Sequence, residues 1–278
     1  MKSEGCELLG NSIITDEIFR LDFGWENDFP AVRAGQFFMI RPRRSGVFLG
    51  RPISAAGFQA SNVQSGVVSF LIVGRGKGTW ELADMRVGEC AQLIGPLGNA
   101  WTDFLPAARE CTKPVALVGG GIGLAPLLAL LLEAPGHVFD LYAGFRSGFA
   151  DEEKKAFFGA ALHNVNKIVI AAEDGTADHK GRIPDFFEPE HYAAICACGP
   201  EHMLKAVAHK AADAGVPCYV SLERRMACGV GACLGCTVKT VDAHRNEHNG
   251  GCSNGGYSNR RCCADGPVFN ANEVVFDD

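Results

Sequence analysis

The stretch VALVGGGIGLAPLLAL, residues Val115–Leu130, places four glycines between a short apolar run and a longer one. The first run has the length of a buried strand, and the second has the length and apolar density of a helix. Glycines at such a position let the chain turn sharply and bring backbone N–H groups close to a phosphate at the helix N-terminus. The stretch therefore predicts a nucleotide-binding turn, whose candidate residues are Gly119, Gly120, Gly121 and Gly123.

This turn departs from the standard G-x-G-x-x-G pattern, because Ala125 and Pro126 stand where the third glycine would be. A proline near the start of a helix is well tolerated, so the helix is still expected. A strand–helix turn that is tight only for packing reasons stays open as an alternative interpretation.

Residues 112–222 continue the alternation of strands and helices. The runs VFDLYAGF, KIVIAAED and YAAICACG have strand character, and PEHMLKAVAHKAADAG has helical character. Such alternation predicts a doubly wound α/β domain with a parallel sheet. Cys198, Gly199 and Pro200 end one strand before a helix. Because dinucleotides bind at the carboxyl ends of parallel strands, these three residues are a second set of candidate nucleotide contacts.

Residues 1–102 contain short apolar runs, such as FFMI and VVSFLIV, separated by Gly, Pro and Ser. This pattern predicts an antiparallel β-barrel domain. Within it, RPIS at Arg51–Ser54 joins a cation to a rigid proline and a small hydroxyl, and GRGKGT follows at Gly74–Thr79. A glycine-rich loop with a cation and a hydroxyl suits a diphosphate. For RPIS taken alone, a simple strand boundary is the alternative.

Residues 223–278 lose regular periodicity and become rich in Gly, Cys, Asn and Arg. Cys228, Cys233 and Cys236 follow the C-x4-C-x2-C spacing of plant-type 2Fe–2S clusters. The glycines between them allow the tight loop that three converging thiolates need. We therefore predict a small C-terminal iron–sulfur domain. A zinc site, which usually needs a second closely spaced cysteine pair, and redox-active thiols are the alternatives.

The fourth cluster ligand is left open by the spacing. Cys252 lies 16 positions after Cys236, whereas Cys262 and Cys263 belong to CCADGPVF, where loop composition gives way to an apolar segment. Spacing slightly favours Cys252. A position beside packed structure favours the adjacent pair, because packing holds a ligand in place.

Composition argues against several classes of function. The net charge is −6 without a strongly basic run, so no nucleic-acid partner is expected. No apolar run is long and clean enough to cross a bilayer, and MKSEGCELLG lacks the apolar core of a signal peptide. We therefore expect no membrane contact and a cytoplasmic location, where the twelve cysteines are thiols or metal ligands.

Taken in order, these motifs resemble a known family. R-P-x-S, GGGIG-x-x-P and C-G-P resemble the ferredoxin–NADP reductase superfamily. ACGVGACLGC, followed by DGPVF, is similar to the electron-transfer subunits of class B dihydroorotate dehydrogenases, and the likeness covers nearly the whole chain. In two places the sequence departs from that family. Val73 stands where an arginine is common, and the loop before the fourth ligand is longer.

The resemblance implies FAD and a 2Fe–2S cluster as cofactors and NAD(H) as co-substrate. It implies that FAD contacts a set of barrel residues, namely Arg51, Pro52, Ile53, Ser54, Leu71, Ile72, Val73, Gly78 and Thr79. It also implies that NAD(H) docks at the glycine turn and at Cys198, Gly199 and Pro200. The implied fourth cluster ligand is Cys263, which directly precedes ADGPVF.

The function implied by the resemblance is a relay of electrons. They would pass between NAD(H) and the FMN of a dihydroorotate dehydrogenase catalytic subunit, supporting oxidation of dihydroorotate to orotate in pyrimidine biosynthesis. The family expectation is a heterotetramer with two copies of each subunit, and we nominate no acid–base catalyst in this chain. Two alternatives stay open: a stand-alone or differently partnered NAD(P)H oxidoreductase, and a zinc-stabilised binding module without redox activity. The sequence does not distinguish NADH from NADPH.

Overall fold

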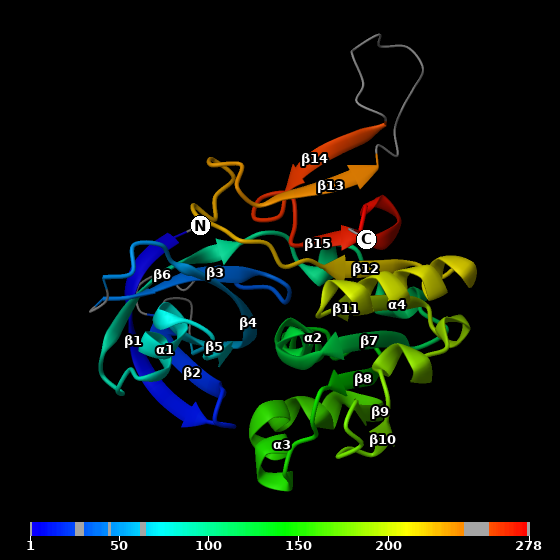
Figure 1. Cartoon of the computed structure of the whole chain (residues 1–278), viewed down its shortest axis with the longest axis horizontal. Coiled ribbons are helices and arrows are strands. Elements are labelled where there is room, and N and C mark those ends of the chain that lie inside the picture. The colour runs from blue at the N-terminus through cyan, green and yellow to red at the C-terminus, as the bar shows by residue number, and fades with distance from the viewer. Residues whose placement is uncertain (1, 26–30, 44–45, 62–64, 242–255, 277–278) are drawn as a thin grey trace.

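The computed structural model describes residues 2–25, 31–43, 46–61, 65–241 and 256–276. Its first part is a closed antiparallel barrel with the strand order β1-β2-β5-β4-β3-β6 (Figure 1). The strands are β1 Lys2–Ile13, β2 Ile18–Trp25, β3 Phe37–Pro42, β4 Arg51–Ala60, β5 Gly66–Val73 and β6 Cys90–Leu97, and helix α1 is Lys77–Ala83. Residues along β2 and β6 alternate between buried and half-buried, because one face of each strand lines the barrel interior. The predicted barrel is confirmed.

The second part is a seven-stranded sheet with the order β10-β9-β8-β7-β11-β12-β15. Its strands are β7 Val115–Gly120, β8 Phe139–Phe145, β9 Val165–Ala172, β10 His179–Lys180, β11 Ala194–Cys198, β12 Cys218–Ser221 and β15 Val268–Asn270. Its helices are α2 Ala125–Glu133, α3 Asp151–Phe158 and α4 Glu201–Asp213. The first six strands are parallel, as predicted, and only β15 is antiparallel.

Strand order in this sheet reverses between β7 and β11. From β7 the chain moves outward through β8, β9 and β10, and it then returns to β11 on the other side of β7. Such a reversal opens a crevice at the carboxyl ends of the two central strands, where ligands bind in doubly wound sheets. Short 3-10 helices fill several connections, namely η1 Trp101–Asp103, η2 Ala108–Glu110, η3 Gly121–Leu124, η4 Gly159–Asn164, η5 Ile183–Phe186, η6 Pro189–His191 and η7 Ala271–Glu273.

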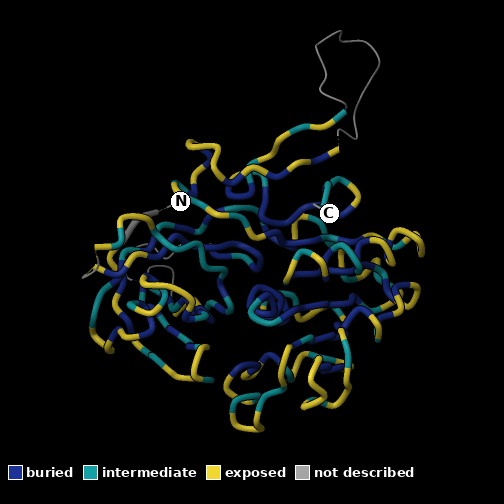
Figure 2. Tube along the Cα trace, viewed as in Figure 1, coloured by how far each residue is buried: buried dark blue, intermediate teal, exposed yellow. Residues whose placement is uncertain are grey.

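Helix α2 joins the barrel to the sheet. Every residue from Ala125 to Leu131 is buried, which requires apolar cover on all sides of the helix. The sheet covers one side and strand β4 of the barrel packs on the other, so the helix lies in the buried interior (Figure 2). At its end the Glu133 carboxylate accepts a hydrogen bond of 2.6 Å from the Ala34 backbone N–H. Barrel and sheet are therefore held against each other.

The C-terminal segment leaves the sheet and then returns to it. After β12 it forms the cysteine loop and a two-stranded hairpin of β13 Thr237–Val241 and β14 Tyr257–Arg261, which projects from the molecule (Figure 1). It then enters the large sheet as β15, paired with β12. Cys252 lies outside the described residues. No helix in the described part of the chain is long and apolar enough to cross a membrane.

Candidate redox site at the junction of the three segments

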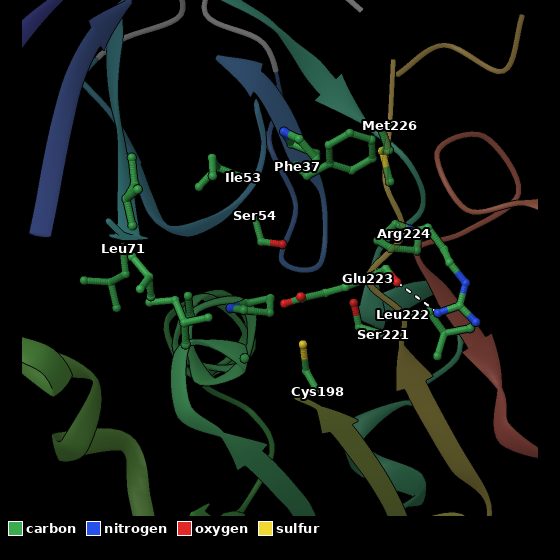
Figure 3. A pocket seen from close by; sticks show the side chains of 18 of the residues that line it. Phe37, Ile53, Ser54, Leu71, Cys198, Ser221, Leu222, Glu223, Arg224 and Met226 are labelled. Atoms are coloured by element: carbon green, nitrogen blue, oxygen red, sulfur yellow. Dashed lines mark hydrogen bonds between the residues drawn. The ribbon is translucent and has the colours of Figure 1, made fainter. Parts of the chain in front are cut away.

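A cavity opens where the barrel, the sheet and the C-terminal segment meet (Figure 3). The barrel lines it with residues of β4 and β5, and the sheet contributes the glycine turn and the end of β11. The segment after β12 closes the remaining side. The residues expected at FAD that line this cavity are Pro52, Ile53, Ser54, Leu71, Ile72 and Val73, and Cys198 faces them. Residues from all three segments thus border one space.

Three polar groups point into the middle of this cavity. In Figure 3 the Ser54 hydroxyl, the Cys198 thiol and the Glu223 carboxylate converge from three different elements. Burial, followed by the nearby Glu223 charge, raises the pKa of Cys198, although the Ser221 hydroxyl hydrogen-bonds to its sulfur. Cys198 is therefore a neutral thiol at this site.

Glu223 was not nominated from the sequence. It lines both this cavity and the neighbouring one, so it stands where the two meet. Its place in the sequence could have indicated it. Glu223 comes two residues after Ser221, the last residue of β12, and β12 is the neighbour of β11, where nucleotide contacts were predicted.

Arg51, Gly78 and Thr79 are not in the lining of this cavity: Gly78 and Thr79 lie in the first turn of α1, and the side chain of Arg51, the first residue of β4, reaches that turn. A Cβ atom on Gly78 would come within 2.7 Å of the Arg51 guanidinium, so only glycine lets that group lie against the helix backbone. The Thr79 hydroxyl accepts hydrogen bonds from the N–H groups of Arg75 (3.0 Å) and Gly76 (3.1 Å), and so it builds the turn. A guanidinium beside glycine-rich backbone fits the diphosphate of a bound dinucleotide such as FAD.

The predicted nucleotide loops touch each other. A Cβ on Gly123 would lie 2.5 Å from the Cys198 carbonyl oxygen, and one on Gly120 would lie 2.7 Å from Pro200 Cδ. Gly121 has φ +54 and no neighbouring atom within 4 Å of the Cβ position, so its backbone faces open space. Both positions 123 and 120 therefore need glycine for the loops to meet.

These loops border a second cavity of about 720 Å³ at the carboxyl ends of the sheet strands. Gly120, Gly121, Gly123, Gly199 and Pro200 line it, together with the ends of β8 and β9. Its size and position at the strand-order reversal fit a dinucleotide. Gly119 lies outside this lining, where a Cβ would collide with the side chain of Leu124 at 2.3 Å.

The four candidate ligand thiols come together beside the first cavity. Cys228 hydrogen-bonds through its side chain to Cys233, and Cys263 does the same to Cys236. The Cys228 sulfur also accepts the N–H groups of Cys233 and Val230, both at 3.4 Å. These donors lower the pKa of Cys228 to about 6, a value at which a thiol readily supplies a thiolate ligand.

Backbone donors also serve the second pair. The Gly231 N–H donates to the Cys263 sulfur at 3.1 Å, and the Cys263 N–H donates to the Cys236 sulfur at 3.4 Å. Cys262 points elsewhere, because its buried thiol donates to the Leu222 carbonyl oxygen at 3.1 Å. Of the two adjacent cysteines, only Cys263 therefore faces Cys236.

The thiols form two pairs, Cys228 with Cys233 and Cys236 with Cys263. Backbone N–H groups point at the sulfurs of Cys228, Cys236 and Cys263. Two thiol pairs with backbone donors fit the ligand set of a cluster with two iron atoms.

The barrel, the doubly wound sheet and the paired thiols define a flavoprotein reductase of the ferredoxin–NADP reductase type with an added iron–sulfur segment. A chain of an NADH-dependent reduced ferredoxin–NADP oxidoreductase has the same fold, with a TM-score of 0.74 and 26% identity, covering 98% of this chain and 90% of that one. A Neisseria gonorrhoeae ferredoxin NADP+ reductase, solved with FAD and NADP, shares the fold at a TM-score of 0.56 and 20% identity, covering 81% and 95%.

Sequence relatives define the family more closely. The dihydroorotate dehydrogenase B (NAD(+)) electron transfer subunit of Clostridium acetobutylicum is 35% identical over 272 residues, covering 96% of this chain and 95% of that one. Its counterpart from Caldanaerobacter subterraneus is 33% identical and covers 98% of both. The family model of the iron–sulfur cluster binding domain of dihydroorotate dehydrogenase B matches residues 223–275. The chain belongs to the family of dihydroorotate dehydrogenase B (NAD(+)) electron transfer subunits. These findings favour neither the stand-alone reductase nor the zinc module.

Proposed function

We propose that this chain carries electrons between NAD(H) and the FMN of a dihydroorotate dehydrogenase catalytic subunit, by way of FAD and a 2Fe–2S cluster. The proposed setting is dihydroorotate oxidation to orotate in the cytoplasm, in an assembly of two copies of each subunit. One observation carries the proposal: a single cavity is bordered by the barrel, by the glycine turn and by the segment that holds the paired thiols. The domain limits 1–102, 112–222 and 223–278 belong to the same proposal.

In this proposal the barrel holds FAD. Bound there, FAD exchanges two electrons as a hydride on one side and single electrons on the other. Arg51 and the backbone at Gly78 and Thr79 hold the diphosphate. Residues 52–54 and 71–73 line the cavity that receives the flavin ring.

The sheet holds NAD(H) next to that ring. Residues 120–123 of the glycine turn and residues 199–200 receive the dinucleotide along the second cavity, while Gly119 shapes the turn and Cys198 borders the first cavity. The two cavities share lining residues, among them Val73, Gly123 and Glu223. Because these residues border both spaces, the nicotinamide end of the cavity opens directly onto the flavin cavity. The neutral Cys198 thiol adds no charge where a hydride has to pass.

The proposed cluster ligands are Cys228, Cys233, Cys236 and Cys263. Cys236 and Cys263 are buried, whereas Cys233 is exposed, so one side of the cluster position faces the interior and the other faces the surface. The next residue, Leu234, is 63% exposed and has φ +58, the only positive φ at a non-glycine residue in the described ranges. Its backbone conformation belongs to the tight loop between two of the proposed ligands. Its exposed apolar side chain, beside exposed Val230, is the kind of surface that a partner covers. We therefore assign the face around Cys233, Leu234 and Val230 to the catalytic subunit.

The test is an anaerobic titration of the purified chain with NADH, followed by visible absorption and by electron paramagnetic resonance. Both the flavin bands and the cluster bands should bleach. In the variant Cys233→Ser the cluster signal and electron delivery to the catalytic subunit should be lost, while NADH still reduces the flavin. Cys111→Ser, which changes a thiol outside the site, is the matched control. Delivery to the catalytic subunit at the wild-type rate in a Cys233→Ser protein without a cluster would refute the relay.

A further inference from the structure

Glu173 lies at the carboxyl end of β9 and lines the nucleotide cavity. Its side chain is exposed, and no hydrogen bond or ion pair to its carboxylate occurs within the described ranges. Its backbone N–H donates to the Phe145 carbonyl at 3.1 Å, so the residue sits at the end of the β8–β9 pairing. A free carboxylate therefore faces the space proposed for NAD(H).

A latch between two loops fixes the position of this carboxylate. The neighbouring Asp174 accepts hydrogen bonds from the Thr176 N–H (3.0 Å), the Thr176 hydroxyl (2.6 Å) and the Ser147 side chain. The Thr176 hydroxyl oxygen also accepts from the Gly148 N–H at 2.6 Å. The loop after β8 is thereby tied to the loop after β9. Because the carboxylate of Asp174 already accepts these hydrogen bonds, Glu173 is the one of the two adjacent acidic residues whose carboxylate is available to bind a ligand.

The distance between strands places Glu173 at the sugar next to the diphosphate. Two strand spacings separate β9 from β7, which is about 10 Å along the sheet edge from the glycine turn. The adenosine ribose is attached directly to the diphosphate that the turn receives. A dinucleotide laid along this edge from Gly121 toward β9 therefore brings its adenosine ribose to Glu173.

We infer that Glu173 makes this chain select NADH over NADPH, an inference that rests on the proposed nucleotide site. A carboxylate accepts hydrogen bonds from the two hydroxyls of the adenosine ribose, as acids at strand ends do in dinucleotide folds. NADPH carries a phosphate on one of those hydroxyls. Its negative charges would meet the carboxylate, and the hydrogen bond from that hydroxyl would be lost.

Arg75, Arg146 and Arg182 line the same cavity and are the arginines that argue for the opposite preference. Both dinucleotides carry the central diphosphate, so these cations attract both. Only a cation paired with the ribose phosphate would favour NADPH, and within the described ranges no ion pair joins Glu173 to any of these arginines. The preference between NADH and NADPH thus depends on which charged side chain lies closest to the adenosine ribose. Because Glu173 lies at the end of β9, we expect that side chain to be Glu173.

The experiment measures binding of two non-reducing fragments, ADP-ribose and its 2′-phosphorylated form, by titration calorimetry of the purified holoprotein. Wild type should prefer ADP-ribose. Glu173→Gln keeps the side-chain size and removes the charge, so it should reduce this preference by about 10- to 100-fold. Glu190→Gln, a change in the same sheet domain outside the cavity, is the matched control and should keep the wild-type ratio.

Three other results would each overturn the inference. An unchanged ratio in Glu173→Gln would assign the selection elsewhere in the cavity. If wild type preferred the phosphorylated fragment, an arginine such as Arg146 or Arg182, and not Glu173, would contact the ribose. Failure of both fragments to bind wild type would remove the proposed nucleotide site itself, and the inference with it.

Discussion

The adjacent cysteines Cys262 and Cys263 provide the sharpest test of the ligand assignment. Both side chains are buried, but they point in different directions. The Cys263 sulfur lies beside Cys236 and accepts the Gly231 N–H, whereas the Cys262 thiol donates to the Leu222 carbonyl. We therefore expect Cys263→Ala to lose the cluster and Cys262→Ala to retain it.

The two variants should also differ in how they change stability. Cys262→Ala removes a fully buried thiol and leaves the Leu222 carbonyl without that donor. Because an S–H group is a weak donor, the cost should be at the low end of the usual range, about 1 kcal/mol. For a protein of this size that lowers Tm by about 2–4 °C. Cys263→Ala removes one of four thiolate ligands, so bound iron should fall from about two atoms per chain to nearly none.

The assay combines iron and sulfide analysis with the electron paramagnetic resonance signal of the reduced protein. FAD content, measured on the same samples, checks that the barrel has folded in each variant. The assignment fails if Cys262→Ala loses iron while Cys263→Ala retains it. Full iron in both variants would point instead to Cys252, which lies outside the described residues.

Three further predictions concern the partner face, the glycine turn and the barrel contact. Leu234→Asp should weaken binding of the catalytic subunit about tenfold, because it adds a charge to an exposed apolar face. Val87→Asp, equally exposed on the barrel, should not change that affinity. Gly123→Ala should cost about 1–3 kcal/mol and weaken ADP-ribose binding, because the new methyl group would collide with a backbone carbonyl. Gly121→Ala meets open space and should cost about 1 kcal/mol, from its positive φ alone, so equal losses would contradict this reasoning. Burial raises the pKa of Glu133 above its ordinary value of 4.5, so stability should fall as pH rises from 4.5 through that raised pKa. In Glu133→Gln the midpoint of urea unfolding should change less between pH 4.5 and 7 than in wild type. The same pH dependence in both proteins would show that Glu133 is not the cause.

Elements with strong local patterns could be predicted from the sequence. The run before the glycine turn is buried at every residue of β7, and its density of apolar side chains is what marks a central parallel strand. The turn at Gly119–Gly123 was equally visible, because glycine is required where backbones approach closely. The spacing of Cys228, Cys233 and Cys236 likewise marks a local loop.

Features that depend on long-range placement could not be predicted. Glu223 and Ser221 are single polar residues at a strand end, and only the neighbouring β11 gives them a role. Nothing in the sequence indicates that β15 returns to the sheet beside β12. The directions of the Cys262 and Cys263 side chains depend on that return of the chain. Two adjacent cysteines in the sequence therefore do not indicate which of them faces Cys236.

The return of the chain also explains how the two proposed cofactor positions can keep a fixed separation. Asn99, just after the barrel, donates to the Val268 carbonyl at 2.8 Å and accepts from the Val268 N–H at 2.9 Å, as a neighbouring strand would. The Asn99 N–H donates to the Gly266 carbonyl at 2.7 Å, and Leu222 N–H donates to the Pro267 carbonyl at 3.0 Å. Residues 266–268 are thus bonded to the barrel on one side and to the sheet on the other, three to five residues after Cys263. Because Pro267 itself lines the first cavity, the proposed ligand Cys263 and the proposed flavin position are both tied to one short stretch of backbone that is anchored on two sides.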